Sequence, residues 1–91
     1  MEELTKELEK KAEILKAISH PIRLCIVKNL IKEGGANVTT MQNCLGAPQS
    51  TVSQHIGKLK ASSIIEGDRN GTEITYRVIN ADVKKVIKAL F

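Results

Sequence analysis

The fold of this chain is decided by residues 46–60, which read Gly-Ala-Pro-Gln-Ser-Thr-Val-Ser-Gln-His-Ile-Gly-Lys-Leu-Lys. The spacing of apolar residues predicts a helix from Pro48 to about Ser62. Small hydrogen-bonding side chains occupy one side of it, and the surrounding window 34–65 contains no Asp or Glu. Such a surface fits a partner that is negative and rich in donors and acceptors, as DNA is. The apolar seam on the other side consists of Val52, Ile56 and Leu59.

A shorter helix is predicted immediately before this one. Thr39 and Gln42 have the spacing of a capping box, with Thr39 at the N-cap, and the helix runs to about Leu45. Gly46 then breaks it. Two short helices with a glycine in the turn between them form a helix-turn-helix, which we place at residues 38–62.

A β-hairpin, or wing, is predicted over residues 64–79. Its two β-prone runs are separated by Asn70-Gly71, a strong signal for a two-residue turn. In the second run, apolar residues alternate with their neighbours, as in a strand with one buried face. The alternating residues are Ile74, Tyr76 and Val78.

Three further helices are predicted around this unit. The first covers residues 2–17 and carries an apolar stripe on a background of Glu and Lys. The second is the most apolar; Ser19 fits its N-cap and Pro21 its first turn. The last spans 81–90, with Asn80 as its N-cap. The predicted order is ααααββα, a mainly α (α+β) winged helix-turn-helix.

Composition limits the classes of function. The 91 residues suit a single domain, 1–91, and the formal net charge is +4. Tyr76 and Phe91 are the only aromatic residues, too few to stack the bases of single-stranded nucleic acid. The sequence has no apolar run for a membrane span and no signal-peptide pattern, so we expect a cytoplasmic protein without a membrane partner. It contains no catalytic constellation or phosphate loop, so neither enzyme activity nor a cofactor is expected.

Three segments resemble the ArsR/SmtB-type family of bacterial repressors. Residues 16–24 (KAISHPIRL) are similar to the family's "KALSDPTRL" opening, residues 49–55 (QSTVSQH) to its recognition-helix signature, and residues 71–78 (GTEITYRV) to the return strand of its wing. The three motifs have the family's order, and the resemblance extends over residues 12–90. It implies a homodimeric repressor that dimerises through its first and last helices and reads a palindromic operator in double-stranded DNA.

The predicted DNA contacts lie on the polar side of helix 48–62 and on the wing. A glutamine carboxamide donates and accepts in one plane and so suits adenine, whereas hydroxyl groups reach bases or phosphates. Flexible lysines position the protein on the phosphate backbone without reading sequence. The candidate residues are Gln49, Ser50, Thr51, Ser53, Gln54, His55, Lys58, Lys60, Arg69, Asn70 and Arg77.

Four basic residues have two interpretations each. His55 either contacts a phosphate or rests against the preceding helix. Arg69 either binds the minor groove or a phosphate, or is an ordinary residue of a charged hairpin tip beside Asp68. Arg77 either contacts the DNA backbone or has no such role. Arg23 either reaches a phosphate or pairs with a Glu of the same protein, and we favour the pairing.

The end helices, residues 1–18 and 80–91, carry apolar stripes that so small a chain has little means to cover. The stripes either pack within the chain or form a dimer interface. A dimer is favoured because two recognition helices must lie about 34 Å apart to read a two-fold operator. The candidate interface residues are Leu4, Leu8, Leu15, Val83, Val86, Ile87, Leu90 and Phe91.

The ligands of the family's metal sites are missing from this sequence. The Cys-x-Cys pair of one such site corresponds to residues 37–41, which contain no thiol. A second site corresponds to Asn80 and Asp82 on the last helix, and the sequence reaches Phe91 before its other ligands. Because Zn²⁺ needs thiolate or imidazole ligands, no metal is expected, as in the metal-independent, PagR-like branch of the family.

Two alternatives remain open. Cys25 and Cys44 are expected to be free thiols, inert where they are buried, but a thiol-responsive repressor, like a metal-responsive one, is an alternative. The other alternative is a winged-helix module that binds protein instead of DNA. Such modules often carry apolar residues on the recognition face, and this chain carries polar ones.

Overall fold

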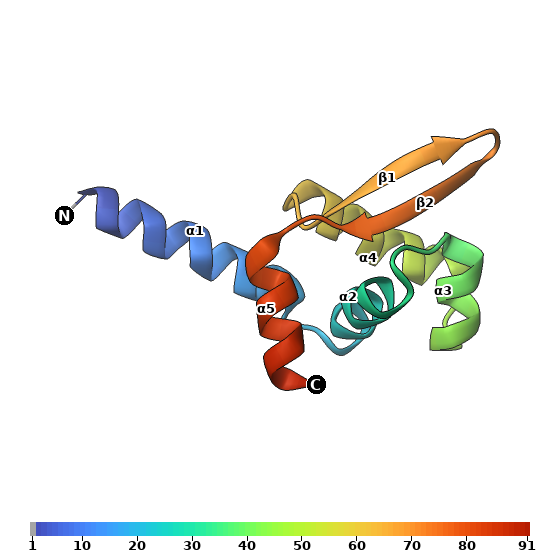
Figure 1. The fold of residues 1–91 in the computed structure, drawn as a ribbon, viewed down its shortest axis with the longest axis horizontal. Helices are drawn as coiled ribbons and strands as arrows, with labels where there is room; N and C mark the ends of the chain where they lie inside the picture. Colours follow the sequence, from blue (N-terminus) through green and yellow to red (C-terminus); the bar gives the residue numbers. More distant parts are fainter. Residues whose placement is uncertain (1) are drawn as a thin grey trace.

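The helices and strands follow the predicted order around a central helix. The structure, a computed structural model, describes residues 2–91. In Figure 1, α2 lies at the centre, the hairpin of β1 and β2 projects on one side, and α1 extends away from the rest of the molecule. The order ααααββα of a winged helix-turn-helix is thereby confirmed. The elements are α1 (Glu2–Ile18), α2 (Pro21–Glu33), α3 (Val38–Leu45), α4 (Gln49–Ala61), β1 (Ile65–Asn70), β2 (Glu73–Val78) and α5 (Ala81–Leu90).

One hydrophobic core joins these elements. The seam of α4 predicted from the sequence is buried in it, together with the apolar faces of α2, β2 and α5. This packing leaves the opposite side of α4 in solvent. Among residues 2–91, no helix combines the length and the apolar character that a membrane crossing requires. The core residues are Ile18, Ile26, Val27, Leu30, Met41, Val52, Ile56, Leu59, Ile64, Ile65, Tyr76, Val78, Val83 and Ile87.

Two helices begin at other residues than the sequence analysis predicts. The N-cap of α2 is His20, not Ser19, and its Nδ1 accepts a hydrogen bond from the backbone N–H of Ile22 at 3.0 Å. The reason is Pro21, which takes the first helical position and holds the residue before it in an extended conformation. The Asn80 cap of α5 is confirmed.

The capping box predicted for α3 is also wrong. The N-cap is Asn37, whose Oδ1 accepts from the backbone N–H of Thr40 at 2.8 Å, so Thr39 already lies inside the helix. The chain just before this cap is fixed by a β-bridge between Ala36 and Tyr76. Because that bridge orients the cap, α3 begins earlier than local sequence indicates.

The turns that join α3 to α4 and β1 to β2 both depend on glycine. Gly46 ends α3 in the left-handed conformation, with φ of +65°. In the hairpin, Asn70 pairs with Glu73, so the two turn residues are Gly71 and Thr72, not the predicted Asn70 and Gly71. Gly71 alone has positive φ there, as a type II′ turn requires at its first central position.

Candidate nucleic-acid interface

The exposed face of α4 is arranged as a polar centre with a flank on each side. Ser50 and Gln54 lie opposite the buried seam and are both exposed. Helical spacing places His55 and Lys58 on one flank and Lys60 on the other, next to the hairpin. Lys60 Nζ lies 5.9 Å from the centre of the Tyr76 ring, which confirms that this flank faces the hairpin. The cations therefore border a centre that carries amide and hydroxyl groups.

The first flank of α4 meets the beginning of α2. The rings of His55 and His20 lie with their centroids 4.5 Å apart, and Arg23 Nη1 is 3.3 Å from His55 Nδ1. Arg23 Nε also donates to the backbone oxygen of Ala17 at 2.6 Å. Arg23 is thus paired with a histidine and a carbonyl, not with the Glu that the sequence analysis favours.

This environment favours the neutral form of His55. Partial burial is the largest cause that lowers the pKa of His55, and the neighbouring His20, Arg23 and Lys58 lower it further. A neutral ring accepts a hydrogen bond at one nitrogen and donates at the other. Since Arg23 can only donate, the Nδ1 that faces it is the acceptor and Nε2 carries the proton.

The two arginines of the wing differ in their partners: Arg77 forms ion pairs within the hairpin, and Arg69 does not. Arg77 lies on the outer face of the hairpin, where Nε donates to Asp68 Oδ2 at 2.9 Å and Nη2 pairs with Glu66. These two carboxylates, Asp68 foremost, raise the pKa of Arg77 above its ordinary value. The side chain of Arg69 lies on the opposite face of the hairpin from these carboxylates. That face also carries Ile74, the cross-strand partner of Arg69. Among residues 2–91, Arg69 has no ion-pair partner, so it is the wing arginine free to meet an anion.

The first turn of α4 adds a second kind of donor. Pro48 occupies its N-cap, and no side chain of the described residues accepts a hydrogen bond from this turn. The free N–H groups of a helix start attract a phosphate. Because Gln49 and Ser50 are exposed in this turn, the groups that can meet bases and phosphates lie next to each other.

His20 is the residue of this surface that sequence analysis missed. The signal was local, since a residue directly before a proline at the start of a helix becomes its N-cap and points at the first turn. The contact of His20 with His55 joins residues of different helices, and no local pattern indicates it.

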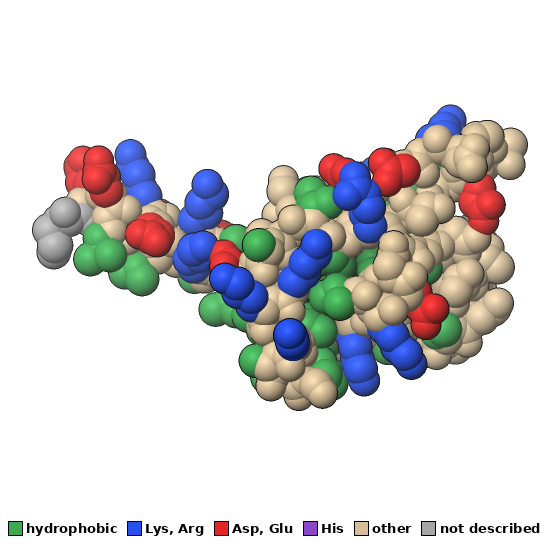
Figure 2. Space-filling view, in the orientation of Figure 1, with side chains coloured by type: hydrophobic (Ala, Val, Ile, Leu, Met, Phe, Trp, Pro, Cys, Tyr) green, Lys and Arg blue, Asp and Glu red, His purple; other side chains and the backbone are tan. Residues whose placement is uncertain are grey.

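The candidate dimer residues divide into two groups. Val83 and Ile87 are buried in the chain's own core and Val86 is half-buried, so these residues contribute little to the surface. The others are exposed, including Leu8 at 62% and Leu90 at 62%. Figure 2 shows hydrophobic side chains along one side of the projecting α1. The exposed candidates are Leu4, Leu8, Leu15, Leu90 and Phe91.

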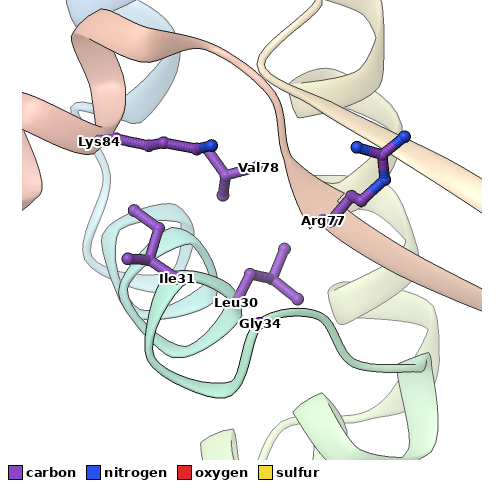
Figure 3. A pocket seen from close by; sticks show the side chains of 6 residues that line it. All are labelled: Leu30, Ile31, Gly34, Arg77, Val78 and Lys84. Carbon is purple, nitrogen blue, oxygen red and sulfur yellow. The ribbon is translucent and has the colours of Figure 1, made fainter.

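A depression of about 310 Å³ lies between α2, β2 and α5, away from the exposed face of α4 (Figure 3). Its floor is apolar, Lys84 extends across it, and the guanidinium of Arg77 turns away from it. Its lining contains no thiol, imidazole or carboxylate that could bind a metal. Within residues 2–91, no three metal-binding side chains come together. The lining residues are Leu30, Ile31, Gly34, Arg77, Val78 and Lys84.

The two cysteines differ in exposure. Cys25 on α2 is half-buried and accepts a weak hydrogen bond from Asn29 Nδ2 at 3.6 Å, whereas Cys44 on α3 is exposed. Burial therefore does not protect Cys44 from reaction.

Comparisons with known proteins agree with this geometry. A family model described as "Helix-turn-helix domain" matches residues 18–68. The transcriptional repressor PagR of Bacillus anthracis is 45% identical over 83 residues, which cover 91% of this chain and 83% of PagR. The biofilm growth-associated repressor of Xylella fastidiosa is 37% identical over 90 residues, which cover 99% of this chain and 78% of the repressor. The crystal structure of PagR has a TM-score of 0.89 at 42% identity and covers 96% of this chain and 99% of its own.

Fold and exposed surface together define a winged helix-turn-helix DNA-binding regulator. The relatives are transcriptional repressors and not enzymes. The chain belongs to the ArsR/SmtB-type family of transcriptional repressors.

Proposed function

We propose that the chain is a homodimeric repressor that reads a two-fold symmetric operator with α4 and the wing. The observation that carries this proposal is the polar centre of α4, bordered by cations on both flanks. A major groove presents base edges between two phosphate backbones, so the arrangement of α4 matches it. The 13 residues of α4 span about 20 Å, enough to cross the groove.

Roles within this surface follow from side-chain chemistry. Gln54 and Ser50, at the centre, read base edges, and Gln49 and Ser53 support them from the hairpin side. Lys58, Lys60 and Arg69 bind phosphates and set the position of the helix. These phosphate contacts supply affinity, and the central residues supply the preference for one sequence.

The second copy of the chain is proposed as the partner of the exposed apolar side chains on α1 and α5. Leu4, Leu8 and Leu15 recur at helical spacing, and each of them is more than half exposed. Contiguous apolar patches of this kind mark interaction sites. Dimerisation brings two recognition helices to one face, as a two-fold operator requires.

Duplex DNA should bind with strong dependence on salt. In a fluorescence-anisotropy titration with random-sequence duplex, we expect affinity to fall steeply between about 50 and 200 mM salt. The reason is that the protein's cationic side chains release counterions from the phosphates, and this release is less favourable at high salt. Binding that does not weaken with salt would contradict the DNA proposal. It would favour the protein-binding alternative, for which the polar face of α4 gives no support.

Chelation should leave DNA affinity unchanged, because residues 2–91 bring no three metal-binding side chains together. The matched measurement adds Zn²⁺ at low micromolar concentration to the same titration. Release of DNA by Zn²⁺, reversed by chelator, would show a metal-responsive repressor. A parallel titration after mild oxidation tests the thiol-responsive alternative, for which the exposed Cys44 is the residue to replace with Ser.

A further inference from the structure

We propose that His20, Arg23 and His55 form a phosphate site beside the recognition helix, and that this site takes up a proton when the phosphodiester backbone binds. The inference rests on the proposed DNA-binding function and adds a regulatory property to it. It makes the affinity for DNA rise as pH falls through the neutral range. The ligand is a backbone phosphate, so the property does not depend on base sequence.

The three side chains are held together before any ligand arrives. Two hydrogen bonds orient Arg23, one to the Ala17 carbonyl and one to His55, while His20 is fixed as the N-cap of α2. The two imidazole rings lie 4.5 Å apart at an angle of 42°. The cluster is therefore preorganised, and it occupies the flank of α4 where Lys58 is also exposed.

Proton positions in the free protein follow from the partners. His20 Nδ1 accepts from a backbone N–H and His55 Nδ1 accepts from Arg23, so neither Nδ1 carries a proton. A second proton on His55 would point its new N–H at the Arg23 guanidinium. A phosphate oxygen within reach of both groups removes that conflict, because both then donate to it and the Arg23–His55 hydrogen bond is no longer needed. Binding of one phosphate thus favours binding of one proton at His55 Nδ1.

Partial burial, and after it the surrounding positive charges, favour the neutral form of His55 in the free protein. Arg23 of α2 and Lys58 of α4 carry these charges, and the ring of His20 lies beside them. The adjoining depression, which Arg23 and Lys58 line, is also lined by Glu13 and Lys16 of α1. Cations outnumber the single carboxylate. A phosphate reverses this balance locally, raises the pKa of His55 and so couples proton uptake to binding.

The test is a titration of random-sequence duplex, carrying a dye insensitive to pH, between about pH 6 and 7.5 at fixed ionic strength. This range covers the ordinary histidine pKa of about 6.5. For the wild-type protein we expect several-fold tighter binding at the lower pH, with a limit of about tenfold per pH unit for one proton. His55→Gln keeps an acceptor for Arg23 but cannot titrate, so its affinity should change much less with pH.

Two further variants separate the possible explanations. His20→Asn keeps a good N-cap while removing the second imidazole, and it should reduce the pH dependence only in part. Lys60→Gln lies on the other flank and should weaken binding equally at every pH. Equal pH dependence in wild type and His55→Gln would overturn the proton-coupled site while leaving DNA binding intact. Absence of salt-dependent DNA binding at every pH would instead overturn the proposed function itself.

A direct measurement avoids reliance on variants that fold poorly. The histidine pKa values can be followed by NMR through the ring Cε1–H signals, with and without duplex. Addition of DNA should raise the pKa of His55. An unchanged or lowered value would contradict proton uptake at this site.

Discussion

Replacing Leu8 and Leu90 with Glu is expected to turn a dimer into a monomer and to weaken binding to a two-fold operator by about 10²–10⁴-fold. Both side chains are 62% exposed, so the change should leave the core of the chain intact. At a dimer interface, however, each carboxylate would be buried without a partner, which is strongly unfavourable. A monomer then binds one half-site alone and loses the gain from linking two recognition helices.

The measurement combines sedimentation of the free protein with titration of an operator selected from random duplexes by the wild-type protein. The matched control is Lys6→Gln with Lys10→Gln, since it lowers the net charge of +4 by the same amount but lies off the apolar stripe of α1. The control should stay dimeric and lose affinity only through its charge. A Leu8→Glu/Leu90→Glu protein that remains dimeric would show that copies do not associate through α1 and α5.

The limits of sequence analysis at this interface have a physical cause. The sequence pattern of an amphipathic helix indicates that one face is covered, but it does not indicate which part of the protein covers that face. Val83 and Ile87 of α5 read like Leu90 in the sequence, yet the first two pack on the chain's own core and only Leu90 stays exposed. Which residues of α5 are buried depends on how α5 packs against α2 after the hairpin, and this packing is part of the tertiary structure.

Sequence patterns within each segment predicted the helices and strands well, but they predicted the first residue of a helix less well. The Asn80 cap and the seam of α4 follow from nearest neighbours along one helix, and both are observed. The start of α3 failed because a bridge to the distant Tyr76 orients Asn37. Likewise, Arg77 is occupied by Asp68 and Glu66 only because the strands pair in a particular register. A long-range contact therefore explains the wrong prediction at the start of α3, whereas the N-cap of α2 was misplaced for a local reason, the position of Pro21.

Gln54→Ala should relax sequence preference by about 1–3 kcal/mol at a single base position of the operator. Gln54 is exposed opposite the seam of α4, where a carboxamide can make paired hydrogen bonds to adenine. Alanine removes both bonds, so the preferred base loses its advantage while the phosphate contacts persist. The measurement compares the affinities of both proteins for the selected operator and for duplexes changed at one position each.

Lys60→Ala is the matched comparison for Gln54→Ala, because Lys60 is proposed to contact a phosphate and not a base. A phosphate contact should weaken binding to all these duplexes alike and reduce the slope of affinity against salt by about one. If Gln54→Ala instead weakens all duplexes alike, Gln54 touches only the backbone. The central face of α4 would then position the protein, and the base preference would have to come from its hairpin-side flank, beginning with Gln49 and Ser53, both of which are exposed.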